Sequence, residues 1–187
     1  MKTSGKYYKE LVLILLITAS LLIIPLSAML FTNEVNWTAS DFFAAWIMLS
    51  ITGLAYRIMT RRMERIAYKA AAAIAAAASL FLLWSNLAVG IIGNEDNPAN
   101  WLYIIVLAVE IIGVIISNFD SGKMARALFA TAIAQAFVPV IAFIFWRSSF
   151  ESEIFIVLAA NAFFVLLFAS AGVLFLRSQG SQKMKIV

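Results

Sequence analysis

Residues 57–69 read RIMTRRMERIAYK, and this stretch decides the fold because it places five basic side chains between two long apolar segments. Residues 42–58 lead into it and residues 67–92 follow it. Each of these segments is close to the ~20 apolar residues that cross a bilayer as a helix. A basic connection between two such helices is typical of the cytoplasmic side of a membrane protein. The stretch therefore predicts a transmembrane hairpin.

Four further apolar runs lie outside this hairpin, at residues 11–31, 101–117, 124–146 and 154–176. The whole chain is 64% hydrophobic and 13% charged, whereas a soluble domain carries roughly 25% charged residues. Lipid must therefore cover most of the surface. We predict an all-α polytopic transmembrane bundle of six helices, which forms one domain over residues 1–187.

The charged residues divide between the two ends of the predicted helices. Of the 14 basic residues, all but Arg147 fall on one side. The acidic residues on the side of Arg147 are Glu34, Asp41, Glu95, Asp96, Glu151 and Glu153. Because cytoplasmic loops are enriched in Lys and Arg, we predict that both termini are cytoplasmic. An odd number of helices would distribute the basic loops over both sides, so the same pattern supports a count of six.

Two residue types are missing from the chain, since it contains no His and no Cys. Zinc sites with His ligands, His-ligated haem and Ser-His-Asp triads are thereby excluded. Disulfides, Fe–S clusters and thiolate nucleophiles are excluded as well. We expect no cofactor, no metal centre and no enzymatic activity. The net charge of +4 follows from the basic loops, so we expect no nucleic-acid partner.

Glu110 is the main candidate for a functional residue, because it lies near the middle of the fourth apolar run. An ionised carboxylate at this depth costs roughly 2.5–3.5 kcal/mol and is a functional candidate by default. Its candidate partners are Asn86, Gln135 and Asn161, each on a different helix. We expect Glu110 to be protonated or hydrogen-bonded to an amide. The polar group is either a proton or cation relay, or a neutral contact that holds helices together.

The connection between the third and fourth helices is a second candidate site. Asn94, Glu95, Asp96 and Asn97 supply oxygen atoms, which hard cations such as calcium bind. Their spacing does not match an EF-hand loop. The alternative is a tight turn, in which Asn97 caps the next helix and Pro98 occupies its first position.

Two other predicted helices begin with a capping box, in which a hydroxyl side chain is followed three residues later by a carboxylate. One box runs from Thr38 to Asp41 and the other from Ser148 to Glu151. Both lie at the less basic side of the predicted bundle.

Three segments carry a resemblance to a family. Residues 84–100 read WSNLAVGIIGNEDNPAN, residues 122–132 read GKMARALFATA, and VNW at 35–37 is followed by DF at 41–42. This pattern resembles a family of small bacterial integral membrane proteins for which no activity is established. The resemblance implies a location in the bacterial inner membrane and a helical fold, and it implies no catalytic role.

For function, we predict a non-catalytic scaffold or accessory subunit, either in a homo-oligomer or in a larger membrane complex. The short loops and the small number of reactive side chains favour this class. The alternative is a small transporter or channel for protons or cations, whose path is lined by Glu110, Asn86, Gln135 and Asn161. A membrane enzyme is the third class and is the least favoured, because no nucleophile–base pair is visible.

Overall fold

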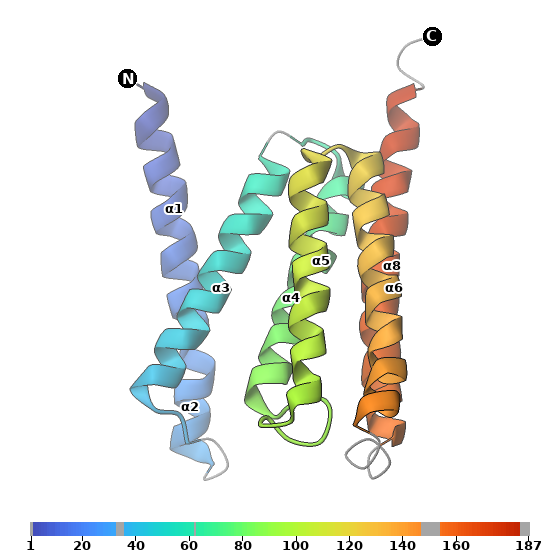
Figure 1. The fold of residues 1–187 in the computed structure, drawn as a ribbon. Coiled ribbons are helices and arrows are strands. Elements are labelled where there is room, and N and C mark those ends of the chain that lie inside the picture. The colour runs from blue at the N-terminus through green and yellow to red at the C-terminus, as the bar shows by residue number, and fades with distance from the viewer. Residues whose placement is uncertain (1, 33–35, 62, 147–153, 184–187) are drawn as a thin grey trace. The chain divides into compact units, whose positions relative to one another are not determined.

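The computed structural model describes residues 2–32, 36–61, 63–146 and 154–183, and these contain helices and turns but no strand. Six helical segments are long and apolar enough to cross a membrane (Figure 1). The all-α fold and the six membrane-spanning candidates are thereby confirmed. The capping box from Ser148 to Glu151 and three charged residues, Glu34, Arg147 and Glu153, lie outside the described residues. The chain divides into two compact units, Met1–Ile58 and Met59–Val187.

The first unit contains α1 (Lys2–Leu21), α2 (Ile23–Phe31) and most of α3 (Ala39–Thr60). The first two helices together form one candidate span, and the helix is interrupted at Leu22. Pro25 explains the interruption, because it lacks the N–H that would bond to the carbonyl of Leu21 and its ring crowds that carbonyl. The predicted run at residues 11–31 is therefore two helical pieces.

Two hydrogen-bonding contacts and an ion pair are described between α1 and α3 within this unit. The hydroxyls of Thr18 and Ser50 lie 2.9 Å apart, and the indole N–H of Trp46 donates to the carbonyl of Leu15 at 3.2 Å. Arg57 forms an ion pair with Glu10, with 2.6 Å between Nη2 and Oε2.

The start of α3 confirms one predicted capping box. The backbone N–H of Thr38 donates to Oδ2 of Asp41 at 2.7 Å, and the N–H of Asp41 donates to Oγ1 of Thr38 at 3.4 Å. Each side chain therefore satisfies a backbone donor of the other residue, as a capping box requires.

The second unit contains α4 (Ile66–Ala88), the 3-10 turn η1 (Pro98–Asn100), α5 (Trp101–Ser117), α6 (Ser121–Phe145) and α8 (Ile154–Lys183). α6 packs along both α5 and α8, and α8 also packs along α4 (Figure 1). Small residues permit this close packing. A Cβ atom on Gly113 of α5 would lie only 2.7 Å from Cβ of Ala127 on α6.

The end of α4 differs from the prediction, since the helix stops at Ala88 and not at residue 92. Gly90 and Gly93 have φ angles of +69° and +71°, which glycine adopts at no steric cost. A Cβ atom on Gly90 would lie 2.4 Å from the backbone of Asn94. The two glycines therefore turn the chain, and residues 89–97 form a loop.

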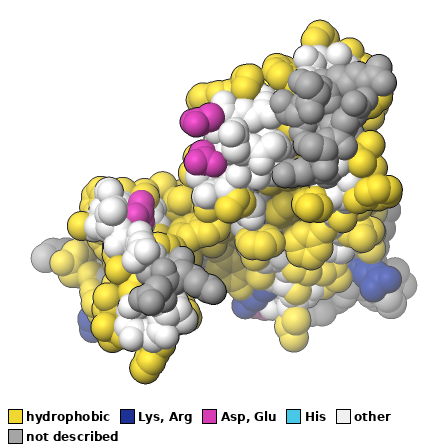
Figure 2. All heavy atoms as spheres, turned by 90° about the horizontal axis from the view of Figure 1, so that it is seen from below, with side chains coloured by type: hydrophobic (Ala, Val, Ile, Leu, Met, Phe, Trp, Pro, Cys, Tyr) yellow, Lys and Arg dark blue, Asp and Glu magenta, His cyan; other side chains and the backbone are white. Residues whose placement is uncertain are grey.

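The opposite end of this unit carries the connection from α5 to α6, the start of α4 and the last turns of α8 (Figure 1). Asp120 caps α6 by accepting a bond from the N–H of Lys123 at 3.0 Å. The buried Tyr68 donates its hydroxyl to the carbonyl of Phe119 at 3.0 Å, and Arg65 donates to the carbonyl of Ser178. These contacts hold together the start of α4, the connection from α5 to α6 and the end of α8, where the described basic residues of this unit lie. The face that contains the 89–97 loop shows acidic side chains among hydrophobic ones (Figure 2).

Candidate functional site

Glu110 is buried on α5, with 6% of its surface exposed. Its Oε2 lies 2.5 Å from Oγ of Ser79 on α4, and the same Oγ lies 2.8 Å from the carbonyl oxygen of Ala75. Ser79 has one hydroxyl hydrogen and cannot donate to both oxygens. A protonated Glu110 resolves this, because it can donate to Ser79 while Ser79 donates to Ala75. The geometry therefore accommodates a neutral carboxyl that links two helices.

A second polar group joins three helices. Nε2 of Gln135 on α6 donates to Oδ1 of Asn161 on α8 at 2.9 Å, and Nδ2 of Asn161 lies 2.9 Å from the hydroxyl of Tyr103 on α5. Nδ2 of Asn161 also donates to the carbonyl of Val157 at 2.7 Å. Asn161 is thus the centre of a hydrogen-bonded chain that connects α5, α6 and α8.

The two polar groups lie at different levels of the bundle. Tyr103 and Glu110 are seven residues apart on α5, and Ser79 and Asn86 are seven residues apart on α4. Seven residues correspond to two helical turns, or about 10 Å along the axis. Of the four residues predicted as one intramembrane site, the structure joins Gln135 and Asn161 directly. Glu110 bonds to Ser79 about two turns further from the 89–97 loop.

Ser79 and Tyr103 take part in these groups and were not identified from the sequence. The sequence does contain a signal for both, because residues seven apart lie on one face of a helix. Tyr103 shares a face with Glu110, and Ser79 shares a face with Asn86. A polar residue two turns from a buried polar residue is therefore a candidate for the same interface.

Two buried side-chain oxygens have no hydrogen-bond partner among the residues that the structure describes, namely Oδ1 of Asn86 and Oε1 of Gln135. Pro139 follows Gln135 by four residues within α6, so the backbone carbonyl of Gln135 lacks its usual helical N–H partner as well. Hydrogen-bond acceptors are therefore available at both positions.

Asn100 organises the loop that was the second candidate site. Its Oδ1 accepts bonds from the N–H groups of Ile91 and Ile92 at 3.2 and 3.0 Å. Its Nδ2 donates to the carbonyls of Ile92 and Asn94 at 3.3 and 2.6 Å. Oδ1 of Asn97 accepts a bond from the N–H of Ala99 at 3.0 Å, which confirms the predicted cap. The four bonds of Asn100 hold the loop in one conformation.

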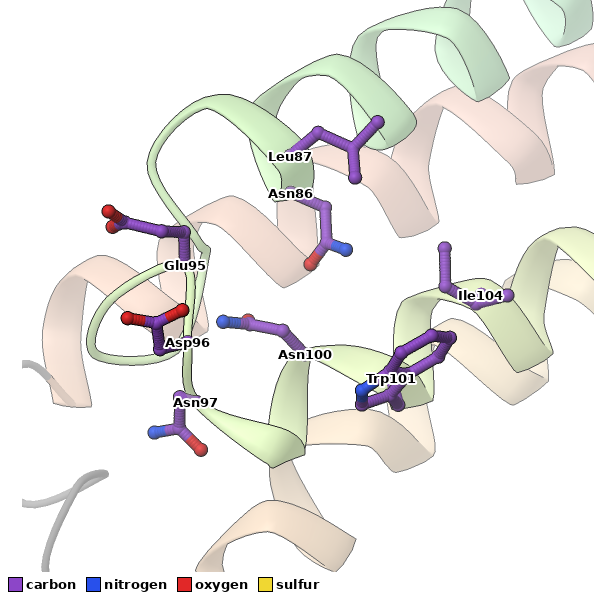
Figure 3. Close-up of a pocket in the computed structure, with 8 residues that line it drawn as sticks. All are labelled: Asn86, Leu87, Glu95, Asp96, Asn97, Asn100, Trp101 and Ile104. Carbon is purple, nitrogen blue, oxygen red and sulfur yellow. The ribbon is translucent and has the colours of Figure 1, made fainter.

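A cavity of about 170 Å³ lies beside this loop, between the end of α4 and the start of α5 (Figure 3). Glu95 and Asp96 line it and are exposed, whereas Asn86 lines it and is buried. Asn94 is exposed and does not line the cavity. Across the described parts of the chain, no three His, Cys, Asp or Glu residues are grouped so that they could hold a metal ion.

Comparison with protein-family models, curated proteins and solved structures finds no match for this chain. The membership of a bacterial membrane-protein family therefore stays a prediction from the three sequence segments.

Proposed function

We propose that this protein is a non-catalytic integral membrane protein that serves as a scaffold or accessory subunit of a larger membrane complex. The observation that carries this proposal is that polar side chains within the candidate membrane spans form hydrogen bonds between helices. Glu110 bonds to Ser79, and Asn161 bonds to Gln135 and Tyr103, each across a helix boundary. Hydrogen bonds of this kind stabilise helix association in lipid.

We further propose that the protein lies in the bacterial inner membrane with both termini in the cytoplasm. Within the second unit, Arg61 and Arg65 precede α4, which starts at the end opposite to the loop that carries Glu95 and Asp96. Lys123 and Arg126, in the first turns of α6, lie at the same end as the two arginines. The positive-inside rule assigns the basic end to the cytoplasm.

Purification of the full chain in a mild detergent, followed by identification of co-eluting chains by mass spectrometry, tests the accessory role. The expected result is a defined set of partner chains that is retained by the Glu110→Gln variant, because Gln can still bond to Ser79. Elution of the protein without any other chain, in several mild detergents and after crosslinking in cells, would contradict the proposal.

A small transporter or channel is the second candidate, and the buried acceptor oxygens of Asn86 and Gln135 favour it. A cation or a water molecule on a permeation path would satisfy such acceptors. In liposomes with an imposed proton, sodium or potassium gradient, this function predicts flux that Glu110→Gln or Gln135→Leu abolishes. If the wild-type protein gives no flux with any of these ions, transport of protons and monovalent cations is excluded.

A further inference from the structure

The cavity beside the 89–97 loop combines a buried polar group with an acidic rim. Its lining includes Asn86 and Leu87 of α4, Glu95 and Asp96 of the loop, and Trp101 and Ile104 of α5. It lies where the candidate span Ile66–Ala88 ends and the candidate span Pro98–Ser117 begins. Both water and lipid headgroups are present at this depth of a bilayer. Trp101 has 70% of its surface exposed, and tryptophan is enriched at the membrane–water interface.

Asn86 supplies the buried polar group. Only 6% of its surface is exposed, and its Oδ1 has no donor among the described residues. An acceptor that is buried without a partner loses its bonds to water and gains nothing in return. Asn86 lines the cavity, but its Oδ1 is itself inaccessible in this conformation, so a bound donor must turn the amide toward the cavity to form this favourable bond.

The neighbouring polar groups restrict the charge of such a molecule. Glu95 and Asp96 present carboxylates, which accept hydrogen bonds and attract positive charge. Both amide hydrogens of Asn100 are already donated to the carbonyls of Ile92 and Asn94. The lining therefore favours a ligand that is both cationic and a hydrogen-bond donor.

The arrangement of these groups favours an organic cation over a metal ion. In Figure 3, Glu95 and Asp96 lie on one side of Asn86, and Trp101 and Ile104 lie on the other. The carboxylate of Glu95 points away from Asn86, so the three groups do not converge on one point, as ligands of a compact cation must. An elongated molecule with a charged end and an apolar end matches this distribution.

We propose that the cavity binds a primary ammonium group that carries a short hydrocarbon chain. The ammonium donates a hydrogen bond to Oδ1 of Asn86 while Glu95 and Asp96 attract its charge, and the hydrocarbon part lies against Trp101 and Ile104. One water-sized group needs about 10–15 Å³ of cavity space, so a cavity of about 170 Å³ has room for several non-hydrogen atoms. The headgroup of an ethanolamine phospholipid and a small soluble amine share this chemistry.

Native mass spectrometry of the full chain in detergent tests the proposal with two lipids of equal acyl composition. Phosphatidylethanolamine has N–H donors, whereas the quaternary ammonium of phosphatidylcholine has none. The expected result is retention of phosphatidylethanolamine about tenfold above phosphatidylcholine, because a hydrogen bond to a charged group contributes about that factor. Asn86→Leu should remove this preference.

A second variant does not depend on correct packing of residue 86. Glu95→Gln combined with Asp96→Asn changes two exposed side chains and should lower phosphatidylethanolamine retention by roughly two- to fivefold, with a weaker salt dependence. Glu64→Gln is the matched control, because Glu64 is also exposed but lies at the opposite end of the same unit. It should leave retention unchanged.

Competition by n-butylamine separates the two sources of the ammonium group. Displacement of phosphatidylethanolamine by millimolar n-butylamine supports a site that also accepts soluble amines, whereas a preference that n-butylamine leaves intact supports the lipid headgroup alone. Equal retention of the two lipids by the wild-type protein would overturn the proposal. So would a preference that persists in both variants, or calcium binding that both variants abolish while the lipid preference is absent.

Discussion

Asn161 connects three helices of the second unit, because its side chain on α8 bonds to Gln135 on α6 and to Tyr103 on α5. Its amide accepts a bond from Gln135 and donates to Tyr103 and to the carbonyl of Val157. In lipid, where water cannot replace a lost partner, removal of the centre of such a chain leaves two other polar groups unpaired.

Asn161→Leu should therefore lower the free energy of unfolding by about 2 kcal/mol, because it removes two bonds between helices and leaves Gln135 and Tyr103 unpaired. A double-mutant cycle with Gln135→Leu should give a coupling energy of about 0.6 kcal/mol, the average for such pairs in membranes. Unfolding in mixed detergent and dodecyl sulfate measures both values.

Ser170→Ala is the control for this cycle, because Ser170 is exposed and its hydroxyl donates to the carbonyl of Leu167 in its own helix. It should change stability by less than about 0.5 kcal/mol. A coupling energy of zero between residues 135 and 161 would contradict the contribution assigned to their bond.

Glu110→Gln distinguishes a neutral carboxyl from an ionised one. If Glu110 is protonated and donates to Ser79, the amide of Gln replaces it with a change in unfolding free energy of less than about 0.5 kcal/mol. If the side chain is ionised, the variant loses a charge-assisted bond, and the change in stability should exceed about 1 kcal/mol. The expected result is the smaller change, measured in the same detergent titration.

At the scale of elements, the 89–97 loop is held by a residue that lies after it in the chain. Asn100 satisfies four backbone groups of Ile91, Ile92 and Asn94, and Ile92 is fully buried. The glycines at 90 and 93 allow the turn, and Asn100 pairs backbone groups that would otherwise be buried without partners.

Asn100→Ala should lower the free energy of unfolding by about 3 kcal/mol, because it leaves several buried backbone groups unpaired at about 1 kcal/mol each. Asn97→Ala, which removes one capping bond, should cost only about 1 kcal/mol. Hydrogen exchange at the amide of Ile92 should accelerate in the first variant and stay near the wild-type rate in the second. Equal costs for the two substitutions would contradict the role of Asn100.

The sequence predicts the positions of helices better than it predicts which side chains form hydrogen bonds with one another. The apolar run at 101–117 coincides with α5, because helix length in a membrane follows from hydrophobic length alone. The break at Leu22 and the early end of α4 depend on single residues, Pro25 and Gly90, whose backbone effects a hydropathy pattern does not register. The bond from Glu110 to Ser79 was not predicted either, since one sequence does not specify which faces of two helices meet.

For the whole molecule, the separation of charge predicts which ends face the cytoplasm. The chain contains no Cys, so a single substitution creates a unique labelling site. Asn94→Cys should react with a membrane-impermeant maleimide added to intact spheroplasts, and Glu64→Cys should react only after the membrane is opened. Both positions are exposed. The reverse pattern would show that the orientation is inverted, and labelling of both positions in intact cells would contradict a single membrane crossing by Ile66–Ala88 between residues 64 and 94.

The hydrogen bonds of the second unit can form at different times during synthesis, because each bond requires that both of its residues have been made. The bonds of Asn100 reach back at most nine residues, so they form as soon as the hairpin of α4 and α5 has been inserted. Gln135 must wait for Asn161, which is 26 residues later, or roughly one to five seconds when synthesis adds about 5–20 residues per second. Tyr103 waits for 58 residues. Until the last helix enters the membrane, the nascent chain therefore carries unpaired polar groups in lipid, and this incomplete state is distinguishable from the finished protein by chaperones and proteases that sense such groups.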